Sequence, residues 1–384
     1  MTDSGDTLDG EVFETRGRLS VADTDSGTVA VWDLDVGMEV QRYDLGAPAL
    51  LHRPLNRQIT AVIAAQPTIG RFDVLGVGVW IWDHVDHFHV YKESAAFQID
   101  SELEMVGGLT EIGVTGGWVI AFDDATGRGT ALFERSIGNL RTDVDRTRAP
   151  VFRDFATEPH DGTALISRGN LFVTQAGGGV ARATQGPTGF GMPQPLMEEC
   201  LDAGTATGAS IYAVYACRDG YLTSTWDEDA GAFEYSRIAH PDGAAAATWL
   251  FGEDDLPHIV GRVSARDLVL IDVPGGTAEV VALEEDIAEV TADRDGQHLL
   301  VLTTSGMLLD LDPSTGMERR RLEGAGAGPI STGDGFVYVA DPATQTVREV
   351  DLENFAEVRQ LDVGMTIGSL VVTALWPGGE PVMH

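Results

Sequence analysis

An internal repeat constrains the fold of this chain more than any other feature of its sequence. Residues 21–45 and residues 339–363 align without a gap, at a constant offset of 318 residues. Identical pairs at this offset include Val21/Val339, Ala22/Ala340, Asp23/Asp341, Thr28/Thr346, Val29/Val347, Asp33/Asp351, Leu34/Leu352, Glu39/Glu357 and Val40/Val358. Self-similarity of this kind indicates a repeat architecture.

Within each copy, short runs of alternating apolar and polar residues are separated by polar turns. Period-two alternation between turns about 8–12 residues apart is typical of antiparallel strands. No long stretch carries apolar residues at helical spacing. The sequence therefore predicts an all-β protein.

Weaker copies of the unit fill the middle of the chain. One marker position per unit defines the series Asp33, Asp73, Glu134, Arg182, Trp226, Asp272, Asp310 and Asp351. The intervals are 38–48 residues, except for 61 residues between Asp73 and Glu134, where residues 79–93 are inserted. Units of about 40–45 residues match the four-stranded blade of a β-propeller. We predict a single propeller over residues 11–384 with about eight blades, seven being the alternative, after a disordered linker at residues 1–10.

The charge of the chain restricts its partners. It carries 60 acidic and 25 basic residues, a net charge of −35, and Lys92 is its one lysine. Such a surface repels nucleic acid and anionic lipid and attracts cations, so we expect no nucleic-acid partner. Adaptation to a high-salt habitat would also explain the acidity. No apolar run is long enough to span a bilayer, so no membrane insertion is expected.

The two cysteines, Cys200 and Cys217, flank a candidate hairpin. In an exported protein they would form a disulfide, and closing a loop of that size contributes about 3 kcal/mol. The alternative is a pair of buried thiols in a reducing compartment. The polar start, residues 1–6, has no signal peptide. It resembles a linker left after removal of a signal or lipid-anchor segment, which favours export.

Residues 79–93 interrupt the second unit and contain a cluster of potential metal ligands. The cluster consists of Asp83, His84, Asp86, His87 and His89. A spacing of two places His87 and His89 on one face of an extended strand. Imidazole and carboxylate together suit Zn²⁺, and less specifically Cu²⁺ or Ni²⁺. The alternative is an exposed polar loop whose histidines have no shared role.

A second interruption, residues 156–163, contains His160 and Asp161. It precedes the innermost strand of its predicted blade, a position that surrounds the central channel of a propeller. Other units carry Glu111, His52 and Asp202 at comparable positions, which would add ligands at the channel mouth. Taken alone, a histidine beside a glycine turn, such as His160, is more often a structural hydrogen-bonding residue than a metal ligand.

Enzymatic motifs are missing from the sequence. It contains no Gly-x-Ser-x-Gly elbow, no phosphate-binding loop and no Cys-x-x-Cys pair. Carboxylates are so abundant that no acid/base pair stands out. We therefore expect a protein that is not an enzyme.

Taken together, these segments resemble the AztD-type zinc metallochaperones, which are periplasmic β-propellers. The resemblance rests on residues 83–87, on Pro159-His160-Asp161-Gly162, on Cys200 with residues 216–220, and on the first and last blades. It implies that His84, His87 and His160 correspond to zinc ligands of the family. The chain departs from the family at Asp161 and Glu111, where histidines are usual, and in a start without histidine.

The resemblance implies an extracytoplasmic zinc-binding protein, periplasmic or extracellular. It would be a monomer that passes Zn²⁺ to the solute-binding protein of a zinc ABC transporter. From the residues we take His84, Asp86, His87, His89, His160 and Asp161 as candidate zinc ligands, with Cys200 and Cys217 as the disulfide. The alternative function is a non-enzymatic platform that recognises a protein or polymer, with metal binding incidental.

Overall fold

Aspartates fix the turns that separate the strands of the repeat. Asp23 Oδ1 accepts hydrogen bonds from the backbone N–H groups of Asp25 (2.9 Å) and Ser26 (2.8 Å). Asp341, at the equivalent position of the last copy, accepts a hydrogen bond from the N–H of Thr344 at 3.4 Å. A side chain that binds the N–H groups two and three residues ahead stabilises a tight turn. The flanking runs can then pair as antiparallel strands.

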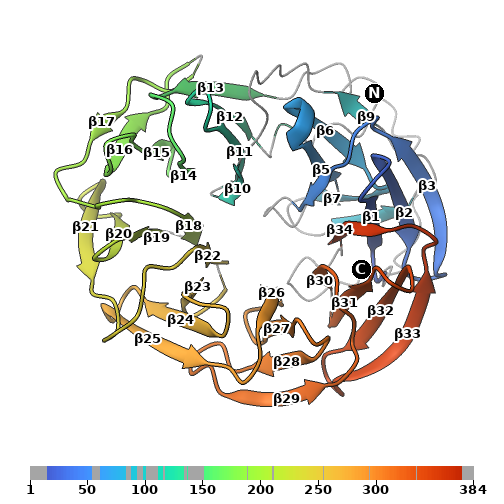
Figure 1. Ribbon diagram of the computed structural model, residues 1–384. Helices are drawn as coiled ribbons and strands as arrows, with labels where there is room; N and C mark the ends of the chain where they lie inside the picture. The colour runs from blue at the N-terminus through green and yellow to red at the C-terminus, as the bar shows by residue number, and fades with distance from the viewer. Residues whose placement is uncertain are drawn as a thin grey trace.

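The computed structural model describes residues 15–53, 61–83, 88–92, 98–100, 111–115, 117–133, 136, 151–187, 189–209, 212–253, 255–293, 295–333 and 335–373. The described strands form eight four-stranded sheets and one two-stranded sheet. The eight larger sheets are the blades of a ring around a central channel (Figure 1). The predicted all-β propeller is thus confirmed, with eight blades.

Each of the first four blades has one strand at the channel and three strands further outward. Blade 1 contains, in this order, β34 (Ile367–Thr373), β1 (Arg18–Asp23), β2 (Thr28–Asp33) and β3 (Met38–Asp44). Blade 2 contains β4 (Leu50–His52), β5 (Ala61–Gln66), β6 (Arg71–Gly76) and β9 (Gln98–Asp100), with the 3₁₀ turn η1 (Pro67–Ile69). Blade 3 contains β10 (Glu111–Thr115), β11 (Trp118–Asp123), β12 (Arg128–Phe133) and β13 (Phe152–Ala156). Blade 4 contains β14 (Ala164–Ser167), β15 (Asn170–Thr174), β16 (Val180–Thr184) and β17 (Gln194–Pro195).

The other four blades follow the same order. Blade 5 contains β18 (Ala206–Ala209), β19 (Tyr212–Cys217), β20 (Gly220–Asp227) and β21 (Ala232–Ile238). Blade 6 contains β22 (Trp249–Phe251), β23 (Ile259–Arg262), β24 (Asp267–Asp272) and β25 (Thr277–Ala282). Blade 7 contains β26 (Ile287–Ala292), β27 (Leu299–Thr303), β28 (Leu308–Leu311) and β29 (Glu318–Leu322). Blade 8 contains β30 (Ile330–Gly333), β31 (Phe336–Asp341), β32 (Thr346–Asp351) and β33 (Ala356–Asp362).

The repeat seen in the sequence is a repeat of strand register. Val21 pairs with Ala30 in blade 1, and Val339 pairs with Arg348 in blade 8, which is the same pairing 318 residues later. Every described marker residue of the series lies on the third strand of its blade. Glu134 lies outside the described residues, directly after the third strand of blade 3.

The two ends of the described chain meet in blade 1. Its inner strand β34 comes from the C-terminal region and pairs antiparallel with β1 from the N-terminal region. Arg16 strengthens this closure, because its Nη1 donates to Glu349 Oε1 of blade 8 at 2.6 Å. The ring is therefore closed by strand pairing and by an ion pair between blades 8 and 1.

Apolar clusters fill the space between neighbouring blades. Val21 and Leu370 of blade 1 pack with Tyr338 and Val347 of blade 8, for example, and all four are buried. Because the side chains of a strand alternate between its two faces, each blade buries one face against each neighbour. Within the described part of the chain, no helix is long and apolar enough to cross a membrane.

Two arginines, the half-buried Arg359 and the buried Arg18, also connect neighbouring blades. Arg359 of blade 8 donates to the buried carboxylate of Glu349 and, at 2.7 Å, to Leu34 O of blade 1. Arg18, paired with a carboxylate of its own blade, donates in the same way to Val77 O of blade 2 at 3.2 Å. A guanidinium has five N–H donors in a rigid fork, so one arginine can neutralise a carboxylate and bind a carbonyl of the next blade.

Strand direction defines two faces of the ring. All strands within a blade are antiparallel, so first and third strands run one way and second and fourth strands run the other. We call the face where inner strands begin the start face and the face where they end the end face. The two-stranded sheet, β7 (Val79–Asp83) and β8 (Phe88–Lys92), is inserted between the third and fourth strands of blade 2. This hairpin, predicted as an insertion, therefore leaves the ring at the end face.

Candidate functional site

His160 lies at the start face, in the loop 157–163 that joins β13 to the inner strand β14, as the sequence predicted. Its Nδ1 is 2.8 Å from Glu158 O, and its Nε2 is 3.0 Å from Thr174 Oγ1. A carbonyl oxygen only accepts, so Nδ1 carries the proton and donates. In the neutral ring Nε2 then holds the lone pair. A histidine whose other nitrogen is bound to a backbone carbonyl has the orientation of a metal ligand.

The close packing around the His160 ring requires glycine at position 162. A Cβ at Gly162 would lie 2.3 Å from His160 Nε2 and 2.4 Å from Thr174 Oγ1. The ring also makes an edge contact with Phe122, with ring centroids 5.3 Å apart. The residue after Asp161 must therefore lack a side chain if His160 is to reach Thr174.

Asp161, the second predicted ligand of this loop, is exposed at the surface. It adjoins His160, but the surrounding carboxylates do not complete a site. Among the residues that the structure describes, no three or more His, Cys, Asp or Glu side chains are grouped to hold a metal ion. A metal held at His160 would need ligands from outside the described residues or from a partner.

The ligands predicted in the insertion remain predictions. His84, Asp86 and His87 lie outside the described residues. His89 lies on β8, where its backbone pairs with Trp82 of β7. The hairpin leaves the ring at the end face, whereas the His160 loop is at the start face. The two predicted ligand groups are therefore attached to opposite faces of the ring.

The channel between the two faces contains a cavity of about 590 Å³. Each inner strand is the edge of its blade, so the N–H and C=O groups on its unpaired side face the channel. Side chains of one inner strand bind several of these N–H groups on the next. Glu289 Oε2 accepts from Ile330 N at 2.9 Å, and Ser331 Oγ accepts from Val372 N at 3.0 Å. Ser369 Oγ of β34 accepts from Leu51 N of β4 in the same way. The inner strands of blades 7, 8, 1 and 2 are therefore each bonded to the next by a side chain.

Two titratable groups in the channel wall have shifted pKa values. Burial raises the pKa of Glu289 to about 7, although the N–H of Ile330 opposes the shift. Burial lowers the pKa of His52 to about 4. His52 Nε2 is buried and has no hydrogen-bond partner among the described residues. Both shifts favour the neutral form, as expected for groups removed from water.

An ion pair crosses the channel at the end face. Arg53 directly follows β4 of blade 2, and Glu253 lies two residues after β22 of blade 6. Arg53 Nη2 is 3.3 Å from Glu253 Oε1, and Arg53 Nη1 donates to Thr332 O of blade 8 at 3.3 Å. Both side chains of the ion pair line the cavity.

The expectation that Glu111, His52 and Asp202 share a place with His160 is wrong for His52. Glu111 begins β10 and Asp202 precedes β18, so both are at the start face. His52 instead ends β4, at the end face. Asp202 is exposed and pairs with Arg218 at 3.0 Å. Sequence position within a unit did not show at which end of the inner strand a residue lies.

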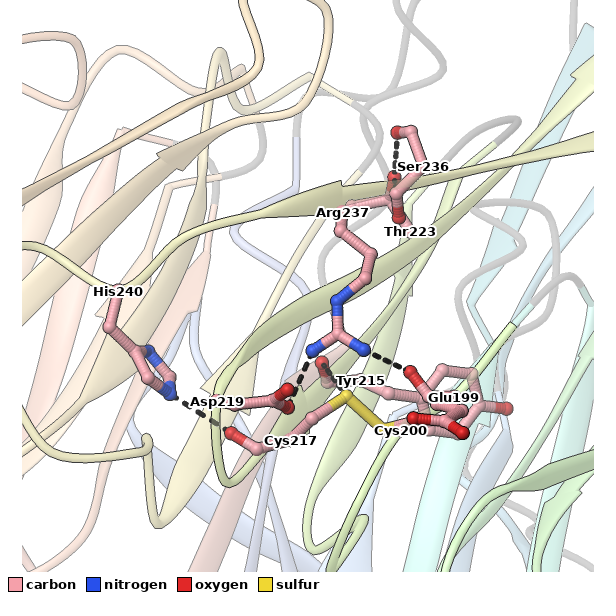
Figure 2. Close-up of a disulfide and its surroundings, with 9 residues drawn as sticks. All are labelled: Glu199, Cys200, Tyr215, Cys217, Asp219, Thr223, Ser236, Arg237 and His240. Carbon is pink, nitrogen blue, oxygen red and sulfur yellow. Dashed lines mark hydrogen bonds and ion pairs between the residues drawn. A yellow bond between two sulfur atoms is a disulfide. The ribbon is translucent and has the colours of Figure 1, made fainter.

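The predicted disulfide between Cys200 and Cys217 is present and almost fully buried (Figure 2). Cys200 belongs to the connection from blade 4 to blade 5, and Cys217 ends β19, so the bond braces the start face. His240 Nε2 donates to Cys217 O at 2.9 Å. Arg237 donates to Glu199 O and to the Asp219 carboxylate, which fastens the same connection to blade 5 (Figure 2).

The similarity to solved structures concerns the fold. No family model matches the chain, and no curated protein matches its sequence. Two crystal structures of AztD from Citrobacter koseri, one of them the apo protein, align with a TM-score of 0.78 each. Each alignment covers 92% of this chain and 96% of AztD, at 17% sequence identity. This chain has the fold of AztD.

Two other solved structures align less well. BamB from Moraxella catarrhalis gives a TM-score of 0.50 at 15% identity, over 86% of this chain and 88% of BamB. The designed protein Ika8 gives 0.54 at 15% identity, over 86% and 95% of the two chains. The fold of AztD thus matches this chain better than either of these two structures does.

Proposed function

We propose that this chain is an exported zinc-binding metallochaperone. It would capture Zn²⁺ and transfer it to the solute-binding protein of a zinc ABC transporter, without catalysing a reaction. Two features support this proposal together: the sequence resemblance to AztD-type zinc metallochaperones, and the AztD fold over 92% of the chain. The buried disulfide is consistent with an oxidising compartment such as the periplasm.

The geometry of His160 is the single observation that carries the proposal. Its Nδ1–H is committed to Glu158 O, so the ring is held with Nε2 as the metal-binding nitrogen. The competitor for that nitrogen is the hydroxyl of Thr174, which also lies 3.2 Å from Thr163 O. When zinc takes Nε2, the Thr174 hydroxyl can donate to Thr163 O instead. The Thr174 O–H therefore still has a hydrogen-bond acceptor when zinc is bound.

Transfer requires a site that another protein can reach. His160 is partly exposed and Asp161 is exposed, so ligands of a partner can approach this loop. One imidazole with one neighbouring carboxylate leaves positions in a tetrahedral zinc shell for incoming ligands. His84, Asp86, His87 and His89 of the insertion would form a second group of zinc ligands.

Zinc content and affinity of the purified, metal-stripped and reloaded protein test the proposal. We expect stoichiometric zinc by mass spectrometry, and a loss of affinity of about tenfold or more in competition titrations of His160→Ala. A triple variant with alanine at His84, His87 and His89 tests the insertion. His258→Ala is the matched control, because His258 directly precedes β23 of blade 6, whose sheet contains neither ligand group, and its Nδ1 lies 3.2 Å from Pro313 O.

The outcomes separate the alternatives. Loss in the triple variant alone would place the capture site on the insertion. Loss in His160→Ala alone would place it at the start face. If the unchanged protein binds no stoichiometric zinc, the metallochaperone proposal is wrong, and a recognition platform becomes the better explanation.

A further inference from the structure

The ion pair at the end face joins opposite sides of the ring. Arg53 belongs to blade 2 and Glu253 to blade 6, which face each other in a ring of eight blades (Figure 1). Their charged groups meet at 3.3 Å, and each side chain is only 17% exposed. A contact between opposite blades can form only by crossing the channel.

A third blade anchors the crossing. The Thr332 carbonyl that accepts from Arg53 belongs to β30 of blade 8. The Thr332 hydroxyl in turn donates to Ala292 O of blade 7 at 2.8 Å. The arginine is therefore attached to the part of the channel wall whose inner strands are linked by side-chain hydrogen bonds.

We infer that Arg53 and Glu253 form a latch that closes the channel at the end face. The channel is then a blind pocket that exchanges its contents through the start face, beside His160. Separating the two charges in a partly desolvated place is unfavourable, which keeps the latch closed. The ring itself is closed elsewhere, by the pairing of β34 with β1 and by Arg16 with Glu349, so the latch can open while the ring stays intact.

The pocket lining agrees with an entrance at the start face. Thr163, the last residue of the His160 loop, and Thr205, just before β18, line the same cavity as Arg53 and Glu253. The cavity therefore extends from one face toward the other and is bounded by the latch. Its volume of about 590 Å³ suits a small polar ligand. The inference applies to any such ligand and does not depend on zinc.

Access to a single thiol at the latch end tests the inference. Thr291 lines the cavity and precedes Ala292, so Thr291→Cys places a thiol near the latch. It is the only reactive thiol, because Cys200 and Cys217 are joined. The probe is neutral methyl methanethiosulfonate. Because Thr291 lies at the latch end of the cavity, the end face is the shorter route for the probe, and we expect Glu253→Ala in this background to raise the modification rate about tenfold above the rate of entry through the start face alone.

The control removes a carboxylate from an ion pair that does not cross the channel. Glu228→Ala breaks the exposed pair with Arg168, whose charged groups are 2.6 Å apart, and should leave the rate unchanged. Equal rates in the Glu253 and Glu228 variants would overturn the inference. Arg53→Gln repeats the test from the other side of the pair. If either latch variant fails to fold, Thr291→Cys alone is measured from low salt to about 1 M salt, where screening should accelerate modification. A rate independent of salt would then reject the latch.

Discussion

The two faces of this ring are held by different chemistry. At the start face, the Cys200–Cys217 bond and the two hydrogen bonds of the His160 ring fix the loops between blades. At the end face, the channel is crossed by the charges of Arg53 and Glu253. A covalent bond does not respond to salt, whereas an ion pair does. The start face is thus built as a rigid mouth and the end face as an adjustable one.

The largest expected effect comes from removing the covalent brace. Replacing both Cys200 and Cys217 by alanine should lower the free energy of unfolding by about 3 kcal/mol, as estimated for the loop that the bond closes. Urea unfolding of the variant measures the loss, and the unchanged protein with reductant provides a second route to it. A loss below about 1 kcal/mol would show that the start face owes little to the disulfide.

The contribution of Glu289, in the channel wall between the two faces, to the free energy of unfolding should depend on pH. The folded carboxyl of Glu289 keeps its proton up to a pKa of about 7, whereas the unfolded chain loses it near 4.5. The stabilising contribution of the neutral form is complete below pH 4.5 and is lost as the pH rises through 7. Glu289→Gln should therefore match the unchanged protein at pH 4.5 and exceed it at pH 8 by about 2 kcal/mol, after allowing for partial exposure.

Denaturant unfolding at both pH values measures this difference. Glu284→Gln is the matched control, since its side chain is 84% exposed in the connection just before β26 and should give no pH-dependent gain. A stability difference between Glu289→Gln and the unchanged protein that stays constant with pH would contradict burial as the cause.

The smallest expected effect concerns the His160 loop at the start face. In Gly162→Ala the new Cβ occupies the space between His160 and Thr174, so the imidazole must move. We expect a loss of about 1.5 kcal/mol in thermal unfolding, typical of overpacking. Gly177→Ala is the control, because a Cβ there meets nothing within 4 Å. Equal stability of the two variants would mean that the loop adapts without cost.

Much of the fold could be predicted because its determinants are local. Asp23 and Asp341 bind N–H groups only a few residues ahead, so each turn is determined by residues that are neighbours in the sequence. Alternation of apolar residues then sets the strands, and the 318-residue offset shows that blades 1 and 8 are alike. The pairing of β34 with β1, which closes the ring, did not follow from these local signals, because β34 lies beyond the second repeated segment.

The candidate site was less predictable, because its contacts are not local. The position of His160 before an inner strand followed from its unit, but its bond to Thr174 depends on a strand that comes later in the chain. Arg53 and Glu253 are 200 residues apart, and neither carries a motif. Their meeting depends on the number of blades, since only an eight-fold ring sets blade 2 opposite blade 6.

Closing blade 1 with strands from both ends of the chain has a consequence for the timing of folding. During synthesis β1 to β3 emerge first, and β34 begins only at Ile367. Until then β1 presents an unpaired edge, and the nascent protein is an open arc. An open arc with an exposed strand edge is the form most exposed to pairing with other chains. Pairing of the seven-residue strand β34 with β1 therefore converts an aggregation-prone open arc into a closed ring.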